Sequence, residues 1–225
     1  MGNKIGIIYF SGTGNTKFVA QNIAKKLQQW GEELDLINIE KDKIIPTHYK
    51  YLIIGGPIYI DRYPEILIKY AKDNLKNYKN KCMLFATQAS EKDSTAYQHF
   101  INNMPNLNVT YCIYVPMPNN VYNFFFKRTE DEKQDEMITN VNDIIEASLK
   151  SFLDGETKLY PRNKFMVFMI NLVYKMVYPM FIKSINKKIN IDNDKCINIC
   201  PKNAFTYKNK ELSQYKPRFK VEKTK

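Results

Sequence analysis

The segment YFSGTGNTKF, residues 9–18, connects an apolar run to a helical pattern. The run KIGIIYF, residues 4–10, is apolar at nearly every position, as in a strand buried on both faces of a parallel sheet. In residues 16–30 the apolar side chains recur with helical spacing, which predicts an amphipathic helix. The segment is therefore a strand-to-helix turn. A helix that begins there presents unpaired N–H groups and a partial positive charge, which suit a phosphate.

The residues of this turn exclude two common phosphate loops. A P-loop needs four residues between its glycines followed by Gly-Lys-Ser/Thr, and the dinucleotide fingerprint needs a third glycine where Lys17 stands. The turn instead offers hydroxyl and amide side chains, and its two glycines let the backbone approach a ligand closely. Such a loop holds a terminal monophosphate without a cation. The predicted binding residues are Ser11, Gly12, Thr13, Gly14, Asn15 and Thr16.

Predicted strands and helices alternate through the rest of the first 155 residues. Further strands are predicted at 34–39, 51–56, 81–87 and 109–115, and further helices at 64–75, 93–103 and 129–153. Most of these strands are continuous apolar runs, whereas the strand at 34–39 alternates, which indicates a place nearer the edge of the sheet. Five strands alternating with helices predict an α/β fold with a doubly wound sheet.

The composition is that of an ordinary globular protein, with 44% hydrophobic and 25% charged residues in a chain of 225. Four cysteines in such a chain do not suggest a disulfide scaffold, and the first apolar run is too short for a signal-peptide core, so we expect a cytoplasmic protein. The two histidines, His48 and His99, are far apart, which argues against a histidine-rich metal site.

Positive charge is concentrated in the last third of the chain. Residues 1–150 contain 18 Lys/Arg and 17 Asp/Glu, a balance of +1, whereas residues 151–225 contain 16 and 6, a balance of +10. A basic segment of this kind attracts an acidic protein, an anionic membrane or nucleic acid, or is simply a solvated surface. We expect no nucleic acid, and the other interpretations stay open at this point.

The six residues Ser-Gly-Thr-Gly-Asn-Thr at 11–16 closely resemble the FMN phosphate loop of the flavodoxins. The resemblance implies a flavodoxin-like sheet of five parallel strands in the order 2-1-3-4-5. It also implies non-covalent binding of FMN and electron transfer by the flavin itself. No side chain stands out as an acid, base or nucleophile, so no catalytic residue is predicted.

Two further segments support this resemblance, since ligands of open α/β sheets bind beyond the carboxyl ends of the strands. GGPIYIDRYP, residues 55–64, is similar to the Gly-x-Pro-x-Tyr segment beside the flavin in many such proteins; the alternative is a surface tyrosine in a proline-bounded turn. ATQASEKD, residues 86–93, would line the other edge of the flavin. The flavin contacts that the resemblance implies are Pro57, Ile58, Tyr59, Thr87, Gln88, Ala89 and Ser90.

One departure from the family lies in the first of these segments. Many electron-transfer flavodoxins place a glycine beside the flavin, and residues 58–61 (Ile-Tyr-Ile-Asp) contain none. A change to positive φ at a β-branched residue is costly. We therefore expect the one-electron-reduced flavin to be less stabilised here than in flavodoxins with that glycine.

The chain changes character after residue 155. Residues 156–190 are predicted to form a linker and a helix rich in methionine and aromatic residues. Its apolar stretch, 165–182, is interrupted by Asn171, Lys175 and Pro179, which argues against a transmembrane helix. We expect it to dock on the main domain, with an interfacial membrane helix as the alternative. Residues 191–225 form a basic tail.

The last two cysteines lie in segments that resemble the ferredoxin-fused flavodoxins of anaerobes. INIDNDKC, residues 189–196, is similar to the entry of that family's first 4Fe–4S motif, and the stretch from Cys200 is similar to the exit of the second. Cys196 and Cys200 stand where the first and last ligands would be, with the intervening ligands missing. We expect a degenerate tail without a 4Fe–4S cluster. A cluster or zinc shared between two chains, or a disulfide, are the alternatives.

These features together predict an FMN-binding carrier that passes electrons between a reductase or ferredoxin and an acceptor. One alternative is an FMN-dependent reductase that uses NAD(P)H and a quinone or other small acceptor. Another is a non-catalytic interaction module with a basic tail. The oligomeric state is open.

Overall fold

The computed structural model describes residues 3–42, 48–89, 94–119, 129–161, 164–186, 205–208 and 211–214. The chain divides into two compact units, Met1–Tyr174 and Lys175–Lys225, which are described separately. The helix α5 (Lys164–Asn186) begins in the first unit and continues into the second.

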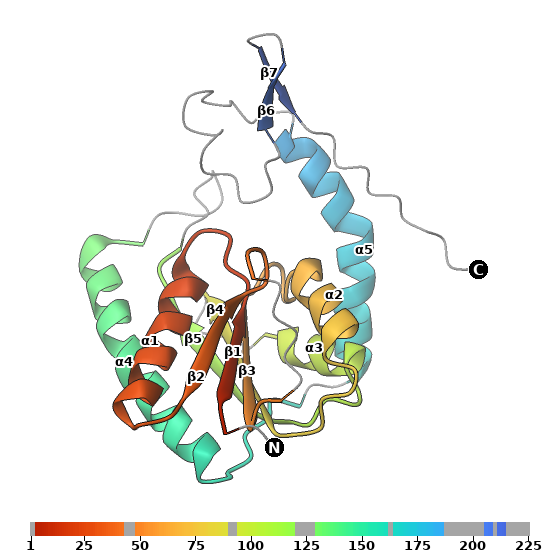
Figure 1. The fold of residues 1–225 in the computed structure, drawn as a ribbon. Helices are drawn as coiled ribbons and strands as arrows, with labels where there is room; N and C mark the ends of the chain where they lie inside the picture. The colour runs from red at the N-terminus through yellow and green to blue at the C-terminus, as the bar shows by residue number, and fades with distance from the viewer. Residues whose placement is uncertain are drawn as a thin grey trace. The chain divides into compact units, whose positions relative to one another are not determined.

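A five-stranded parallel sheet forms the centre of the first unit (Figure 1). Its strands in spatial order are β2 (Leu34–Asn38), β1 (Ile5–Tyr9), β3 (Tyr51–Pro57), β4 (Cys82–Gln88) and β5 (Val109–Pro116). All four pairs of neighbours are parallel. The predicted flavodoxin-like order 2-1-3-4-5 is confirmed, and the strand with alternating apolar residues, β2, is at an edge.

Helices cover both faces of this sheet (Figure 1). On one side lie α1 (Asn15–Gln29) and α4 (Asp131–Leu153), and on the other α2 (Glu65–Asn74) and α3 (Ala96–Asn103). The strands are therefore buried on both faces, which explains their nearly continuous apolar runs. The start of α4 is two residues later than predicted, because Thr129 lies in the preceding loop and its hydroxyl accepts a hydrogen bond from the Asn119 N–H (3.0 Å).

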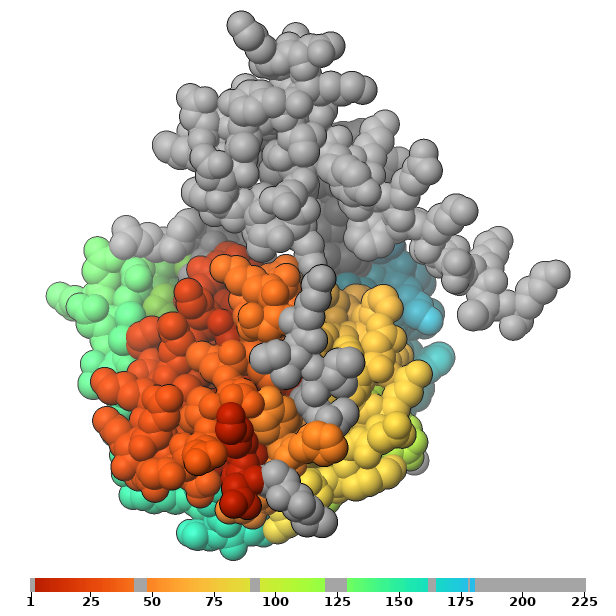
Figure 2. All heavy atoms as spheres, viewed as in Figure 1, coloured from red at the N-terminus to blue at the C-terminus, as the bar shows by residue number. Residues whose placement is uncertain are grey.

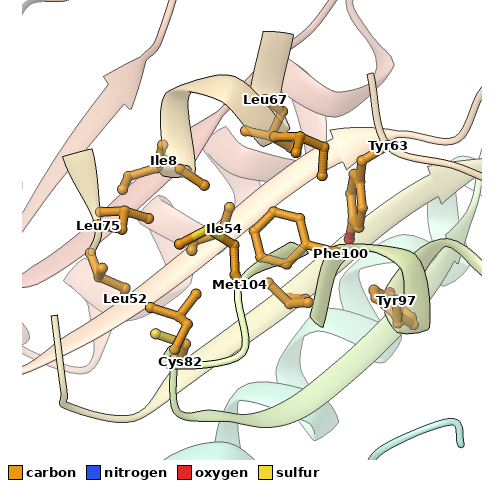
Figure 3. Close-up of a cluster of buried hydrophobic side chains, with 14 of the residues drawn as sticks. Ile8, Leu52, Ile54, Tyr63, Leu67, Leu75, Cys82, Tyr97, Phe100 and Met104 are labelled. Carbon is orange, nitrogen blue, oxygen red and sulfur yellow. The ribbon is translucent and has the colours of Figure 1, made fainter. Parts of the chain in front are cut away.

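Each face of the sheet packs into its own apolar core. Figure 3 shows the core under α2 and α3, where the rings of Tyr63 and Phe100 lie close together, 5.5 Å between centroids. On the other face, strand side chains pack with α1 and α4. One position there admits only glycine: a Cβ at Gly55 would lie 1.8 Å from the Phe85 ring. The Phe85 ring of β4 therefore packs directly against the backbone of β3 at Gly55.

The described part of the second unit consists of the remainder of α5 and a short antiparallel pair, β6 (Phe205–Lys208) and β7 (Glu211–Gln214). None of the helices described is long and apolar enough to cross a membrane. Cys196 and Cys200 fall outside the described residues, so the expectation of a metal-free tail stays a prediction. The predicted boundaries at residues 155 and 190 also stay predictions.

Candidate functional site

A pocket opens at the carboxyl ends of β1, β3, β4 and β5. It encloses about 570 Å³, including space shared with solvent. In the sheet, β1 lies between β2 on one side and β3 on the other, so the direction of the strand order reverses at β1. Open α/β sheets bind ligands at such a switch point. The lining residues are Ser11, Gly12, Thr13, Asn15, Thr16, Pro57, Ile58, Tyr59, Thr87, Gln88, Ala89, Pro118 and Asn119.

The pocket gathers most of the residues predicted from sequence. Two predicted residues are not in the lining: Gly14, which is the N-cap of α1, and Ser90, which lies outside the described residues. Two lining residues, Pro118 and Asn119, were missed. They follow β5, and the apolar run of β5 could have been used to predict them. Residues that follow parallel strands lie together at the edge of the sheet where the strands end.

The first loop, residues 11–14, is shaped by Ser11 and Gly14. The Ser11 hydroxyl oxygen accepts hydrogen bonds from the N–H groups of Gly14 (3.2 Å) and Lys17 (3.1 Å). It thereby caps the first turn of α1, where Gly14 itself offers no side chain. Gly14 has φ 110°, a conformation that other residues rarely adopt. The loop therefore forms a small cradle at the helix N-terminus.

Side chains at the start of α1 tie this loop to the neighbouring strands. The Asn15 side-chain N–H donates to the Pro118 carbonyl (2.9 Å), and the Thr16 and Thr87 hydroxyls share a hydrogen bond of 2.8 Å. Thr16 and Thr87 are almost completely buried. Each hydroxyl would lose its buried partner if the other were removed, which costs about 1–3 kcal/mol in typical cases. The start of α1, the end of β4 and the segment after β5 are thus held together as one rim.

The second loop, residues 57–62, adopts a turn that its sequence does not favour. Ile60 and Asp61 have φ values of 49° and 58°, so both central residues of the turn are left-handed, and the Tyr59 N–H donates to the Arg62 carbonyl (2.8 Å). Left-handed backbone costs an L-residue about 1–2 kcal/mol, and a β-branched residue there is a true outlier. The turn therefore already holds two residues at positive φ, and the expectation of a less stabilised one-electron-reduced flavin stays a prediction.

Tyr59 bridges the two loops. Its side chain is 42% exposed, and its hydroxyl lies 2.8 Å from the position that a Cβ would take at Gly12. The ring therefore reaches from the second loop to the first. An aromatic ring so placed offers a planar apolar surface with a polar end to a ligand in the pocket.

Arg62 connects the second loop to α5. This residue was not predicted from the sequence. Its side chain is only 6% exposed and donates through Nη2 to the Asn171 side-chain oxygen. The guanidinium lies 3.9 Å from the centroid of the Tyr174 ring, a cation–π contact. Burial lowers the pKa of Arg62 from its usual value. Figure 2 shows part of α5 (blue) next to α2 (yellow).

The described part of the pocket lining is electrically neutral. None of the described residues that line it is a lysine, arginine, histidine, aspartate or glutamate. An anion bound there would be held by N–H groups, hydroxyls and the dipole of α1 rather than by a cation. Among the described residues there is also no group of three His, Cys, Asp or Glu side chains that could hold a metal ion.

The cysteines of the sheet are unsuited to ligand chemistry. Cys82 and Cys112 are fully buried in β4 and β5, and burial raises the pKa of both thiols. A buried thiol that stays protonated behaves as a small core side chain.

Comparison with known proteins agrees with this geometry. Residues 6–112 match the family model described as a flavodoxin domain. The matched range begins in β1 and ends in β5. No curated protein matches the chain.

Solved structures resemble part of the chain. A flavodoxin from the domain Archaea is 15% identical and covers 65% of this chain and 99% of its own, with a TM-score of 0.43. A flavoprotein in complex with FMN from Lactobacillus acidophilus is 22% identical and covers 50% and 93%, with a TM-score of 0.43. The two-electron reduced flavodoxin of Megasphaera elsdenii is 14% identical and covers 63% and 98%, also at 0.43.

Proposed function

We propose that this protein binds FMN non-covalently in the pocket above the sheet and serves as an electron carrier. The observation that carries the proposal is the neutral, glycine- and hydroxyl-rich cradle at the N-terminus of α1, placed at the switch point of the sheet. The match of residues 6–112 to the flavodoxin domain supports it.

The residues present fit FMN at both ends. The first loop would hold the 5′-phosphate through backbone N–H groups and the hydroxyls of Ser11, Thr13 and Thr16. The flavin ring would lie between the second loop, with Tyr59 against it, and the segment that begins at Thr87. When bound, FMN supplies reversible acceptance of one or two electrons.

The protein's own part is binding, orientation and exclusion of water. The hydrogen bonds of Asn15 and Thr16 hold the rim of the pocket in place, which reduces the ordering needed when a ligand binds. Tyr59 covers one side of the pocket, and Ile58 adds apolar surface beside it. No described lining residue is a histidine or carboxylate, and the proposal gives no side chain a proton-transfer role.

The proposal extends to the partner and the tail. The basic residues of 151–225 would favour an acidic redox protein as partner, in the cytoplasm. Residues 191–225, with Cys196 and Cys200, would be a remnant of a ferredoxin-like region that binds no cluster, because two thiolates in one chain cannot complete a site of four.

The first test is the absorbance spectrum of the purified full chain, handled without oxygen, before and after FMN is added, with iron assayed on the same sample. Bound FMN with visible flavin bands and no iron is the expected result. A colourless protein that leaves added FMN unchanged would overturn the proposal. Iron with a cluster band would show that two chains share a site through Cys196 and Cys200.

Turnover separates a carrier from an NAD(P)H-dependent reductase. The FMN-loaded protein is given NADPH or NADH with a quinone, and its rate is compared with that of free FMN under the same conditions. A carrier gives no rate above free FMN, and it is reduced instead by a reduced ferredoxin or its reductase. Rapid turnover with a nicotinamide would assign the protein to the reductases.

A further inference from the structure

The helix α5 exposes far more apolar surface than the other helices. Along Phe165–Tyr174, only Val167 is buried, and Ile170, Asn171 and Tyr174 are half-buried, so a single narrow stripe contacts the rest of the unit. Large apolar side chains surround that stripe. Those that are exposed in the first unit are Phe165, Met166, Phe168, Met169, Leu172 and Val173, defined here as the α5 apolar surface.

The contrast with the other helices is sharp. Among the described residues, α1 and α4 each show one large exposed apolar side chain, Phe18 and Ile138. Single exposed apolar residues are normal, whereas a continuous apolar surface on one element indicates an interaction. A helix that is apolar around most of its circumference is typically buried, because contact of its apolar side chains with water is unfavourable.

The charge of the surrounding chain identifies the kind of surface that would cover it. Residues 157–191 contain no aspartate or glutamate. The cations in the same range are Lys158, Arg162, Lys164, Lys175, Lys183, Lys187 and Lys188. An apolar helix among cations without any anion matches the headgroup region of an anionic bilayer.

The same charges disfavour a second copy of this chain as the occupant. Two copies that met through α5 would bring two segments of like charge together, which is repulsive. Lys175, which is exposed between Val173 and Met176, would also have to enter a dry interface. At a bilayer its long apolar stem can lie along the helix while the ammonium reaches the headgroups.

We propose that α5 binds the surface of an anionic lipid bilayer with its apolar surface in the interfacial region. The helix lies on the bilayer rather than across it, since no described helix is suited to span one. Its half-buried stripe stays on the domain, where Asn171 and Tyr174 contact Arg62. This inference does not depend on the proposed flavin site, and a chain without FMN would bind in the same way.

The test is co-sedimentation of the full chain with two kinds of vesicle, pure phosphatidylcholine and phosphatidylcholine with roughly 30 mol % phosphatidylglycerol. The informative pair of variants is Leu172→Glu and Leu159→Glu. Both leucines are 42% exposed, and only Leu172 lies in α5, so each variant adds the same charge at the same exposure. Circular dichroism verifies that both variants are folded, and Phe168→Ser, which leaves the charge unchanged, serves as a further variant.

The expected result is binding to the anionic vesicles that weakens as salt is raised from about 0.05 M to about 0.5 M. Leu172→Glu and Phe168→Ser should weaken this binding about tenfold or more, and Leu159→Glu should leave it within about twofold. The absence of vesicle binding would overturn the proposal. Equal losses in Leu159→Glu and Leu172→Glu would do so too, and so would a lipid-free dimer that Leu172→Glu dissociates.

Discussion

The two loops that border the pocket reach unusual backbone conformations in opposite ways. In the first loop, Gly14 takes positive φ without steric cost, and the Ser11 hydroxyl supports the turn from within. In the second loop, Ile60 and Asp61 take positive φ without a glycine. That loop is supported from outside, since Thr95 donates to the Asp61 carbonyl (3.2 Å) and Arg62 contacts α5. The shape of the first loop is set by residues of the same segment, whereas the shape of the second loop depends on contacts with Thr95 and with α5.

If FMN binds as proposed, the two loops have different roles. The loop at the phosphate end is a fixed anchor built from local interactions. The loop at the ring end stores strain, and strained backbone often accompanies ligand-binding segments. Changes in the first loop should therefore affect affinity most, and changes in the second should affect stability.

The largest effect is expected from Gly14→Ala. There is open space for a Cβ, but φ 110° is a conformation that L-residues rarely adopt, so we expect a loss of about 1–3 kcal/mol in unfolding free energy. We also expect FMN affinity to fall about tenfold or more, because the cradle changes shape. Urea unfolding of the FMN-free protein and FMN titration measure the two effects.

Gly31→Ala is the matched control for Gly14→Ala. Gly31 also has open space and positive φ, 81°, but it follows α1 at the opposite end from the pocket. It should destabilise the protein to a similar degree and leave FMN affinity unchanged. Equal losses of affinity in the two variants would show that the effect reports stability and not the cradle.

A smaller effect concerns acid stability near the second loop. His99 in α3 is partly buried; burial first, and then the charges of Arg62 and Lys72, lower its pKa from 6.5 to about 4. Between these values the unfolded chain binds a proton that the folded chain does not, so stability falls as pH drops from 6.5 towards 4. With allowance for partial exposure, this amounts to roughly 2 kcal/mol.

The measurement is urea unfolding at neutral pH and near the lower pKa of about 4. His99→Gln should lose roughly 2 kcal/mol less than the unsubstituted protein over this range. His48→Gln, at an exposed histidine, serves as the control and should retain the full loss. An unchanged acid loss in His99→Gln would contradict the assignment to His99.

The smallest effect is expected from relief of strain in the second loop. Ile60→Gly should stabilise the protein by about 1 kcal/mol, because the left-handed backbone costs isoleucine more than the extra chain entropy costs glycine. In the helical control Ile138→Gly, at another exposed isoleucine, we expect a loss of about 0.5–1 kcal/mol. A destabilising Ile60→Gly would mean that Ile60 is not strained. Thermal unfolding of both variants measures the difference.

Much of the fold follows from the sequence, for reasons visible in particular elements. The strands β1, β3, β4 and β5 are buried on both faces, so their apolar runs are long and easy to recognise. The spacing in α1 reflects one buried face. The first loop could also be predicted from the sequence, since glycines and hydroxyl side chains at the start of a helix are typical of a phosphate-binding turn.

The rest depends on tertiary contacts that no local pattern reports. Positive φ at Ile60 opposes the preference of a β-branched residue, so the local sequence does not predict it. Arg62 meets Asn171 and Tyr174, more than a hundred residues away in the chain. Pro118 joins the pocket through the side chain of Asn15, again across a long sequence separation.

The most direct test of the central claim compares the affinities of FMN and riboflavin for the full chain. The two ligands share the ring and differ in the 5′-phosphate, so their ratio isolates the first loop. If the cradle at the N-terminus of α1 holds the phosphate, FMN binds about a hundredfold more tightly than riboflavin or better, and Gly14→Ala reduces the ratio. Equal affinities for the two ligands would contradict the account.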